Sequence, residues 1–88
     1  MKKVFKVIEI KNNEHDGVSY EYVTKIDVSY YGKIAIVTSP NVLDAMKFMD
    51  EAYYEEKEKR ELMLKLVKAH FPKKDHTISY RTLNIEVK

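Results

Sequence analysis

The stretch VSYEYVTKIDVSY, residues 18–30, alternates between apolar and polar side chains. One set of alternate positions is apolar or aromatic apart from Thr24, and it contains Tyr20, Tyr22, Ile26, Val28 and Tyr30. The other set is polar apart from Val23, and it contains Ser19, Glu21, Lys25, Asp27 and Ser29. A period of two residues is typical of a strand that buries one face and exposes the other. Residues 18–30 therefore predict an antiparallel strand, around which the rest of the fold is inferred.

Two shorter strands are predicted beside it. Residues 3–11 (KVFKVIEIK) are rich in β-branched and aromatic side chains, which favours a strand. The polar residues 12–17 (NNEHDG) then predict a turn. After a second turn at Tyr31 and Gly32, residues 33–38 (KIAIVT) predict a short third strand. The three strands are expected to form an antiparallel meander.

A long helix is predicted next. Ser39 can cap free amide groups, and Pro40 suits the first helical position. Apolar residues recur at helical spacing in two blocks, 42–53 and 62–71. The charged block between them (EEKEKRE) contains acid-first pairs four residues apart, each of which stabilises a helix by ~0.2–0.5 kcal/mol. We therefore expect one helix over 40–71, straight or bent near its middle.

Residues 76–87 predict a last strand whose apolar phase changes along its length. The change runs from Ile78 and Tyr80 on one face to Leu83, Ile85 and Val87 on the other. Residues 3–11 show a similar change, which either a β-bulge or burial of both faces would explain. A crossover helix predicts that the last strand is parallel to the third, and placing it beside the first gives the order 3-2-1-4. The predicted fold is thus α+β, a βββαβ arrangement.

The composition allows a single domain over residues 1–88. The absence of cysteine excludes disulfides, thiolate nucleophiles and cysteine-based zinc sites, and it favours a cytoplasmic protein. No stretch has the ~20 apolar residues of a membrane span, so no membrane association is expected. The net charge of +2 is far from that of a strongly basic nucleic-acid binder.

Catalytic and metal sites are not expected. His70 and His76, with Asp75, form the strongest candidate metal site, but a six-residue spacing over a loop matches no recognised metal pattern, and solvated loop histidines are the favoured interpretation. Gly17 and Gly32 are isolated, whereas phosphate and dinucleotide loops require several glycines. We therefore predict no enzyme, no cofactor, no metal and no small-molecule substrate.

Binding residues are expected among the tyrosines, the methionines and one basic cluster. Tyr20, Tyr22 and Tyr30 are core residues if they face the helix and recognition residues if they face solvent. The basic cluster at the helix end either grips phosphates or is a solvated helix terminus. The predicted binding residues are Tyr54, Met63, Lys65, Lys68, Lys73, Lys74 and Arg81.

Three segments, GKIAIVTS (32–39), LDAMKF (43–48) and EA (51–52), resemble small uncharacterised proteins of phages and prophages from AT-rich Gram-positive bacteria. The likeness covers about a third of the chain. It implies a hairpin, a helix that starts near Leu43, and a closing strand. It implies no activity and no functional residue. It does imply a setting, the host cytoplasm, in which small proteins often bind and block host machinery.

The leading hypothesis is a non-enzymatic protein-binding module, with a phage-encoded modulator or inhibitor of host machinery as its specific form. The expected partner is another protein or a second copy in a homodimer, because the distal half of a long helix needs more cover than a thin sheet is expected to supply. The alternative is a nucleic-acid-binding protein that uses the basic helix end and the corner after it.

Overall fold

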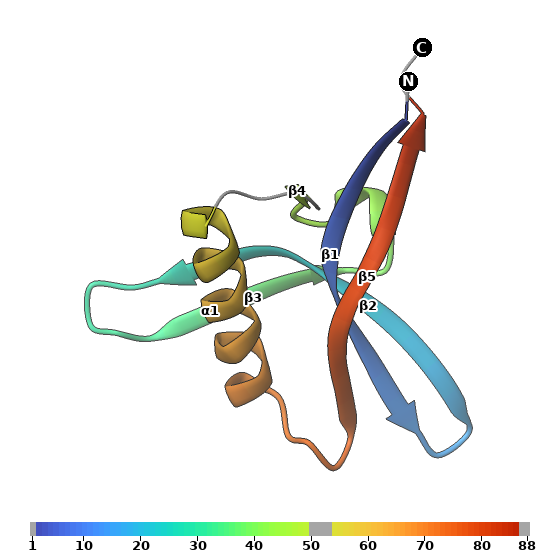
Figure 1. Ribbon diagram of the computed structural model, residues 1–88. Coiled ribbons are helices and arrows are strands. Elements are labelled where there is room, and N and C mark those ends of the chain that lie inside the picture. Colours follow the sequence, from blue (N-terminus) through green and yellow to red (C-terminus); the bar gives the residue numbers. More distant parts are fainter. Residues whose placement is uncertain (1, 50–53, 87–88) are drawn as a thin grey trace.

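The computed structural model describes residues 2–49 and 54–86. Its elements are the strands and helices shown in Figure 1. In chain order these are β1 (Lys2–Glu14), β2 (Gly17–Val28), β3 (Ile34–Ser39), the 3₁₀ turn η1 (Val42–Asp44), β4 (Phe48–Met49), α1 (Tyr54–His70) and β5 (His76–Glu86). The predicted α+β fold is confirmed: a three-stranded antiparallel meander, one helix and a C-terminal strand.

Strand β1 is the centre of the sheet. One of its edges pairs with β5 along almost its whole length, from Lys2 opposite Glu86 to Asn12 opposite His76. The other edge is divided between β2, which pairs with residues 9–14, and the short β4, which pairs with residues 5–6. The predicted pairings of β3 with β2, of β2 with β1, and of the last strand with β1 are therefore correct.

The predicted direction of the last strand is wrong. Strand β5 runs antiparallel to β1, whereas a strand parallel to β3 would run parallel to β1. The physical reason is that α1 does not follow β3 directly, because residues 40–49 first return to β1 as strand β4. Both β4 and β5 are antiparallel to β1, so the crossover helix joins two parallel strands, as the rule requires. The first strand of that unit is β4 and not β3.

The predicted helix over 40–71 is also too long. Ser39 is the last residue of β3, and its hydroxyl accepts a hydrogen bond from the Asn41 amide at 3.1 Å and donates one to Asp44 at 2.9 Å. The Asn41 side chain caps η1 by accepting from the Leu43 amide at 3.0 Å. Residues 43–48, in which the resemblance implied a helix start, thus lie in the 3₁₀ turn, the extended segment after it and the start of β4. The part of the prediction on 50–53 lies outside the described residues.

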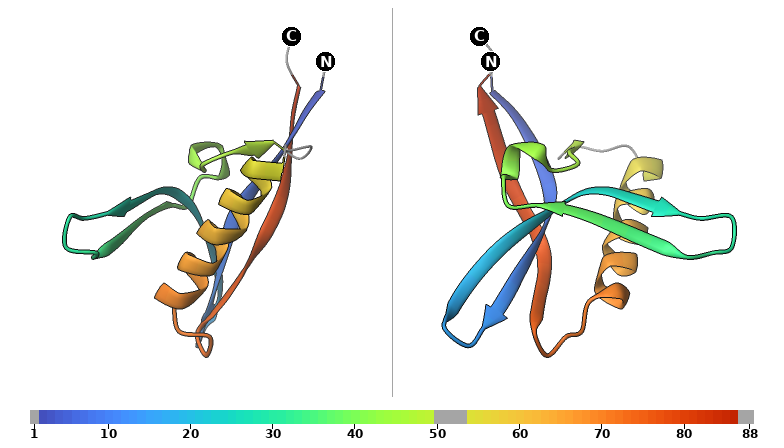
Figure 2. Two further views of the ribbon diagram at one scale, coloured as in Figure 1. Left: turned by 60° about the vertical axis from the view of Figure 1, so that its left-hand side comes forward. Right: turned by 180° about the vertical axis from the view of Figure 1, so that it is seen from behind.

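The apolar residues of the 42–49 segment suggested a helix because their spacing is helical, but they serve two different faces of the sheet. Val42 and Ala45 pack against Val7 on one face. Met46 and Phe48 pack against the core under α1 on the other. Figure 2 shows α1 and η1 on opposite sides of β1. The segment therefore crosses from one layer to the other instead of forming a single amphipathic helix.

Burial of both faces explains the phase changes in β1 and β5. The neighbours Val7 and Ile8 are 0% and 1% exposed, although successive side chains of a strand point to opposite faces. The register between β1 and β5 is continuous, so the phase changes are not caused by a bulge between these two strands. In β5, Tyr80 packs on the α1 side and Leu83 on the η1 side. Two small cores thus share one central strand.

Strand β2 changes partner midway. Its first half pairs with β1, and from Tyr22 onwards it pairs with β3. The register shifts between Val23 and Lys25, and the hydroxyl of the intervening Thr24 donates to the Val37 carbonyl at 3.1 Å. Bulges bend a strand and increase its twist. The β2–β3 hairpin consequently leaves the body of the protein and projects to one side, as Figures 1 and 2 show.

Candidate functional site

The end of the projecting hairpin is a closed, well-bonded turn. The Ser29 amide donates to the Lys33 carbonyl at 2.8 Å, and the Gly32 amide donates to the Ser29 carbonyl at 2.9 Å. The Lys33 amide donates to the Ser29 hydroxyl at 3.0 Å. Gly32 has φ +78°, a conformation that favours glycine. We call residues 28–34 the hairpin end, and its backbone is held in one shape by these bonds.

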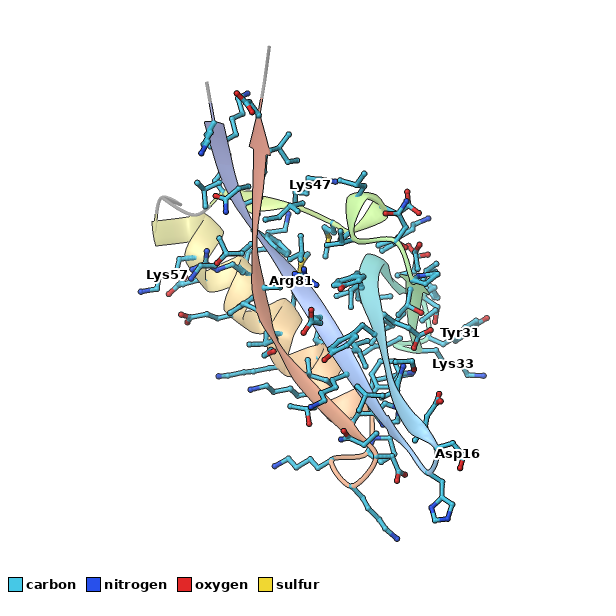
Figure 3. All side chains as sticks on the ribbon, turned by 90° about the vertical axis from the view of Figure 1, so that its right-hand side faces the viewer. Asp16, Tyr31, Lys33, Lys47, Lys57 and Arg81 are labelled. Carbon is cyan, nitrogen blue, oxygen red and sulfur yellow. The ribbon has the colours of Figure 1, made fainter. Side chains whose placement is uncertain are left out.

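Two adjacent aromatic residues occupy this turn and are almost fully exposed. Tyr30 is 98% exposed and Tyr31 is 88% exposed. Their ring centroids lie 5.6 Å apart at an interplanar angle of 89°, an edge-to-face contact. Figure 3 shows Tyr31 pointing outward from the hairpin. Tyrosine offers a large, rigid contact area with a polar tip and is enriched in protein interfaces.

The apolar face of the hairpin continues past the helix that covers it. Ile26 and Ile36 are cross-strand partners that pack against the core under α1. The next pair on the same face is Val28 opposite Ile34. Val28 is 63% exposed, so the cover provided by α1 has ended at this pair. The hairpin end therefore joins the exposed Val28 and the half-buried Ile34 to an exposed tyrosine pair.

The charges near the hairpin end are few. Lys25 and Asp27 lie 3.3 Å apart as an exposed pair on the face opposite Val28, where they largely neutralise each other. Lys33 is exposed in the turn itself, as Figure 3 shows, and it gives the hairpin end a single positive charge. This surface is thus mainly apolar and aromatic with a weakly basic rim.

The structure separates the predicted basic cluster. Lys65 and Lys68 are exposed on α1, and Lys73 and Lys74 are exposed in the turn that follows. Arg81 points to the opposite face of the sheet. Its guanidinium donates to the Tyr22 hydroxyl at 2.7 Å and to Glu9 at 3.3 Å. The negative charge that Tyr22 carries once its phenol ionises, and the hydrogen bond that Arg81 donates to the Glu9 carboxylate, raise the pKa of Arg81 above its usual value.

The remaining predicted binding residues do not join a common surface. Met63 is half-buried and packs against the core. The Tyr54 side chain lies outside the described part of the structure. The turn that carries Lys73 and Lys74 lies beside the β1–β2 turn, because the Asn13 amide donates to the Asp75 carbonyl at 2.9 Å. Glu14 at the end of β1 and Asp16 in the turn are acidic, so their charge opposes that of the two lysines.

The candidate metal residues serve a packing role. The Phe71 ring lies between His70 and His76, with ring centroids 5.1 Å from each. The His76 Nδ1 lies 3.1 Å from the Pro72 carbonyl oxygen. Among residues 2–49 and 54–86, no group of three histidine, cysteine or acidic side chains is placed to hold a metal ion.

The helix needs less outside cover than expected. Val67 is fully buried, and Met63 and Phe71 pack against the same core. Leu62 alone of the large apolar residues on described parts of α1 is mostly exposed. The sheet therefore covers the distal half of α1, and this removes the reason for placing a second copy there.

Of the three tyrosines on the apolar face of the predicted strand, one is buried and two are exposed. Tyr22 is buried, but on the face opposite α1. Tyr20 is partly exposed and Tyr30 almost fully exposed. The alternation of residues 18–30 left open whether Tyr30 faces the core or solvent, and neither Tyr30 nor Tyr31 was among the predicted binding residues. The available signal was the Tyr30-Tyr31 pair itself, since two adjacent residues beside a turn glycine cannot both face one core.

Arg60 and Tyr80 form a second polar feature, on α1 and β5. Arg60 is 7% exposed, its guanidinium donates to the Met49 carbonyl at 3.3 Å, and its carbon Cζ lies 5.3 Å from the centre of the Tyr80 ring. The Tyr80 hydroxyl donates to the Arg60 carbonyl at 3.1 Å. The pair ties the helix to the last strand and has a structural role.

Tyr80 makes the stability sensitive to alkaline pH. Burial raises the pKa of its phenol above the usual 10.0, although the charge of Arg60 opposes this shift. Because the folded-state pKa of Tyr80 is raised, the contribution of its neutral phenol to the free energy of unfolding is fully present below the unfolded pKa. This contribution is lost as the pH rises through the folded pKa.

We expect Tyr80→Phe to lower the free energy of unfolding by about 1 kcal/mol at neutral pH. Above pH 10 we expect a smaller loss of stability in the variant than in the parent, measured by urea unfolding at several pH values. Parallel pH curves for the two proteins would contradict this assignment.

No protein-family model, curated protein or solved structure matches this chain. Within residues 2–49 and 54–86, no helical segment combines the length and the hydrophobicity that a membrane span requires.

Proposed function

We propose that this chain is a protein-binding module that docks through its hairpin end. The observation that carries the proposal is the exposure of Tyr30 and Tyr31 on a hairpin that projects from the body. Two adjacent aromatic rings that stay in water contribute no hydrophobic free energy to folding. A partner pocket that buries them gains the hydrophobic free energy of their whole apolar area.

The shape and stiffness of the hairpin end support this proposal. Binding free energy is concentrated in a few residues, chiefly tyrosine, tryptophan and arginine, that fill pockets in the partner. The hydrogen bonds of the turn fix the backbone that carries both rings, and the rings contact each other edge to face before binding. Less conformational entropy is then lost on association. The partner surface that fits is an apolar cleft with a carboxylate near its rim for Lys33. The resemblance to small phage proteins extends the proposal to a modulator or inhibitor of host machinery.

Site-specific photo-crosslinking tests the proposal. A benzophenone amino acid replaces Tyr31 in cells of the organism that carries the gene, and the same amino acid replaces Asp16 in a control variant. Asp16 lies in the turn of the other hairpin and is also exposed, so the two positions differ in location and not in accessibility. We expect one protein to be captured from position 31 and not from position 16.

A second substitution links the capture to the tyrosine pair. Adding Tyr30→Ser to the position-31 probe is expected to weaken binding by about 2 kcal/mol, or roughly 30-fold, because interface tyrosines carry contributions of this size. The same proteins captured from both turns, or none from position 31, would overturn the proposal. Capture of nuclease-sensitive material, lost at high salt, would favour the nucleic-acid alternative instead.

A further inference from the structure

Strand β3 has an outer edge that no described residue pairs with. It is the last strand on its side of the sheet and pairs only with β2. The Lys33 carbonyl accepts from the Ser29 amide, and the Val37 carbonyl accepts from the Thr24 side-chain hydroxyl, so both carbonyls point to the inner edge, toward β2. Because these groups alternate along an antiparallel strand, the amides and carbonyls of Ile34 and Ile36 point to the outer edge. Neither residue makes a further hydrogen bond within 2–49 and 54–86.

This edge also lacks the features that normally prevent strand addition. Natural edge strands are guarded by lysine, proline, inward charges or bulges in the edge strand itself. The six residues of β3, IAIVTS, contain no charged residue, no proline and no glycine. The long outer strand β5, on the opposite edge of β1, carries Arg81. An unguarded edge on a projecting hairpin is suited to pairing with another segment.

We propose that the partner docks by adding an extended segment to the outer edge of β3, while the tyrosine pair contacts the same partner beside it. This inference rests on the proposed function and names the chemistry of its partner. Strand addition provides affinity through main-chain hydrogen bonds and specificity through alternate side chains. The free groups of Ile34 and Ile36 supply the hydrogen bonds.

The two faces and two ends of β3 define the segment that fits. On one face the segment lies beside Ile34 and Ile36, and on the other beside Ala35 and the half-exposed Val37, so apolar side chains suit both faces near the strand centre. Lys33 adjoins one end of β3. At the other end, Asp44 is held 2.9 Å from the Ser39 hydroxyl. A segment with an acidic residue near Lys33 and a basic residue near Asp44 is complementary in charge.

A second copy of the chain is a poor occupant of this edge. Antiparallel pairing of β3 with its own copy about a two-fold axis would place both α1 helices on the same face of the joined sheet. Ile36, at the middle of β3, packs against the core that α1 covers. The two helices would then compete for the space over the axis. A single extended segment brings no helix and avoids this conflict.

Two changes on β3 test strand addition in the crosslinking experiment. Ile34→Pro removes an outward amide that the hairpin does not use, whereas Ile34→Val keeps that amide and serves as the matched control. With the probe at position 31, we expect about tenfold or greater loss of capture in Ile34→Pro and little change in Ile34→Val. Thermal unfolding by circular dichroism checks that both variants fold.

A second probe avoids any loss of stability. A benzophenone amino acid at the exposed Ala35 projects from one face of the edge strand β3, and we expect it to capture the protein that position 31 captures, within an extended stretch that mass spectrometry locates. Capture from 31 but not from 35, with Ile34→Pro unaffected, would overturn strand addition and leave the proposed function standing. Absence of capture from position 31 would overturn both.

Discussion

Replacing Ile8 with alanine is expected to lower the free energy of unfolding by about 2–5 kcal/mol, the usual cost of truncating a buried isoleucine. Ile8 is 1% exposed and packs with Ile10, Val23 and Val67, the buried residues of the core under α1. A domain of this size has a total stability of about 4–13 kcal/mol. The substitution therefore removes a large fraction of that stability. Urea unfolding followed by circular dichroism measures the loss.

The exposed Val28 provides the control for this measurement. Val28→Ala is expected to change the free energy of unfolding by less than about 0.5 kcal/mol, because the side chain is largely in water. A loss of similar size in the two variants would mean that the hairpin end is packed in solution. It would also remove the basis for the binding proposal.

Replacing Arg60 with alanine is expected to lower the free energy of unfolding by about 2–4 kcal/mol, because two interactions of its guanidinium are lost together. The hydrogen bond from the guanidinium to the Met49 carbonyl is one to a charged group, and such bonds contribute about 1.5–3 kcal/mol. The stacking on Tyr80 adds about 0.5–2 kcal/mol. Arg60 is nearly buried, so truncation also leaves a cavity.

Methionine at the same position separates packing from charge. The Nε of Arg60 is buried and has no hydrogen-bond partner in the described structure, so the guanidinium is incompletely compensated. We expect Arg60→Met to fill most of the volume and to recover at least half of the stability that Arg60→Ala loses, as measured by urea unfolding. A methionine variant as unstable as the alanine variant would show that the charge itself is required.

The sequence predicts the strands well because their signals are local. The alternation of residues 18–30 and the β-branched run of 3–11 depend only on neighbouring side chains. The phase changes in β1 and β5 were visible in the sequence, but choosing between a bulge and two-face burial required knowing that η1 covers Val7. The bulge at Thr24 was hidden because it lies where β2 exchanges one partner strand for another.

The helix start and the candidate site were harder to predict. Ser39-Pro40 is a good helix start by local chemistry, yet Ser39 completes β3 and bonds to Asp44 instead. The apolar residues after it satisfy a helical period while facing two separate cores. The basic residues attracted attention because charge is visible in a sequence. The exposure of Tyr30 depends on how far the hairpin extends beyond α1, which only tertiary structure defines.

The pairing of Lys2 with Glu86 has a consequence for the order of folding. The two hairpins can form early, since each joins neighbouring segments of the chain. Strand β1, however, remains an open edge until β5 arrives from the far end of the sequence, and a contact of such long range forms slowly. During synthesis the apolar side chains of β1 and β2 are consequently exposed for longer than those of α1. This nascent state is where we expect dependence on chaperones to be greatest.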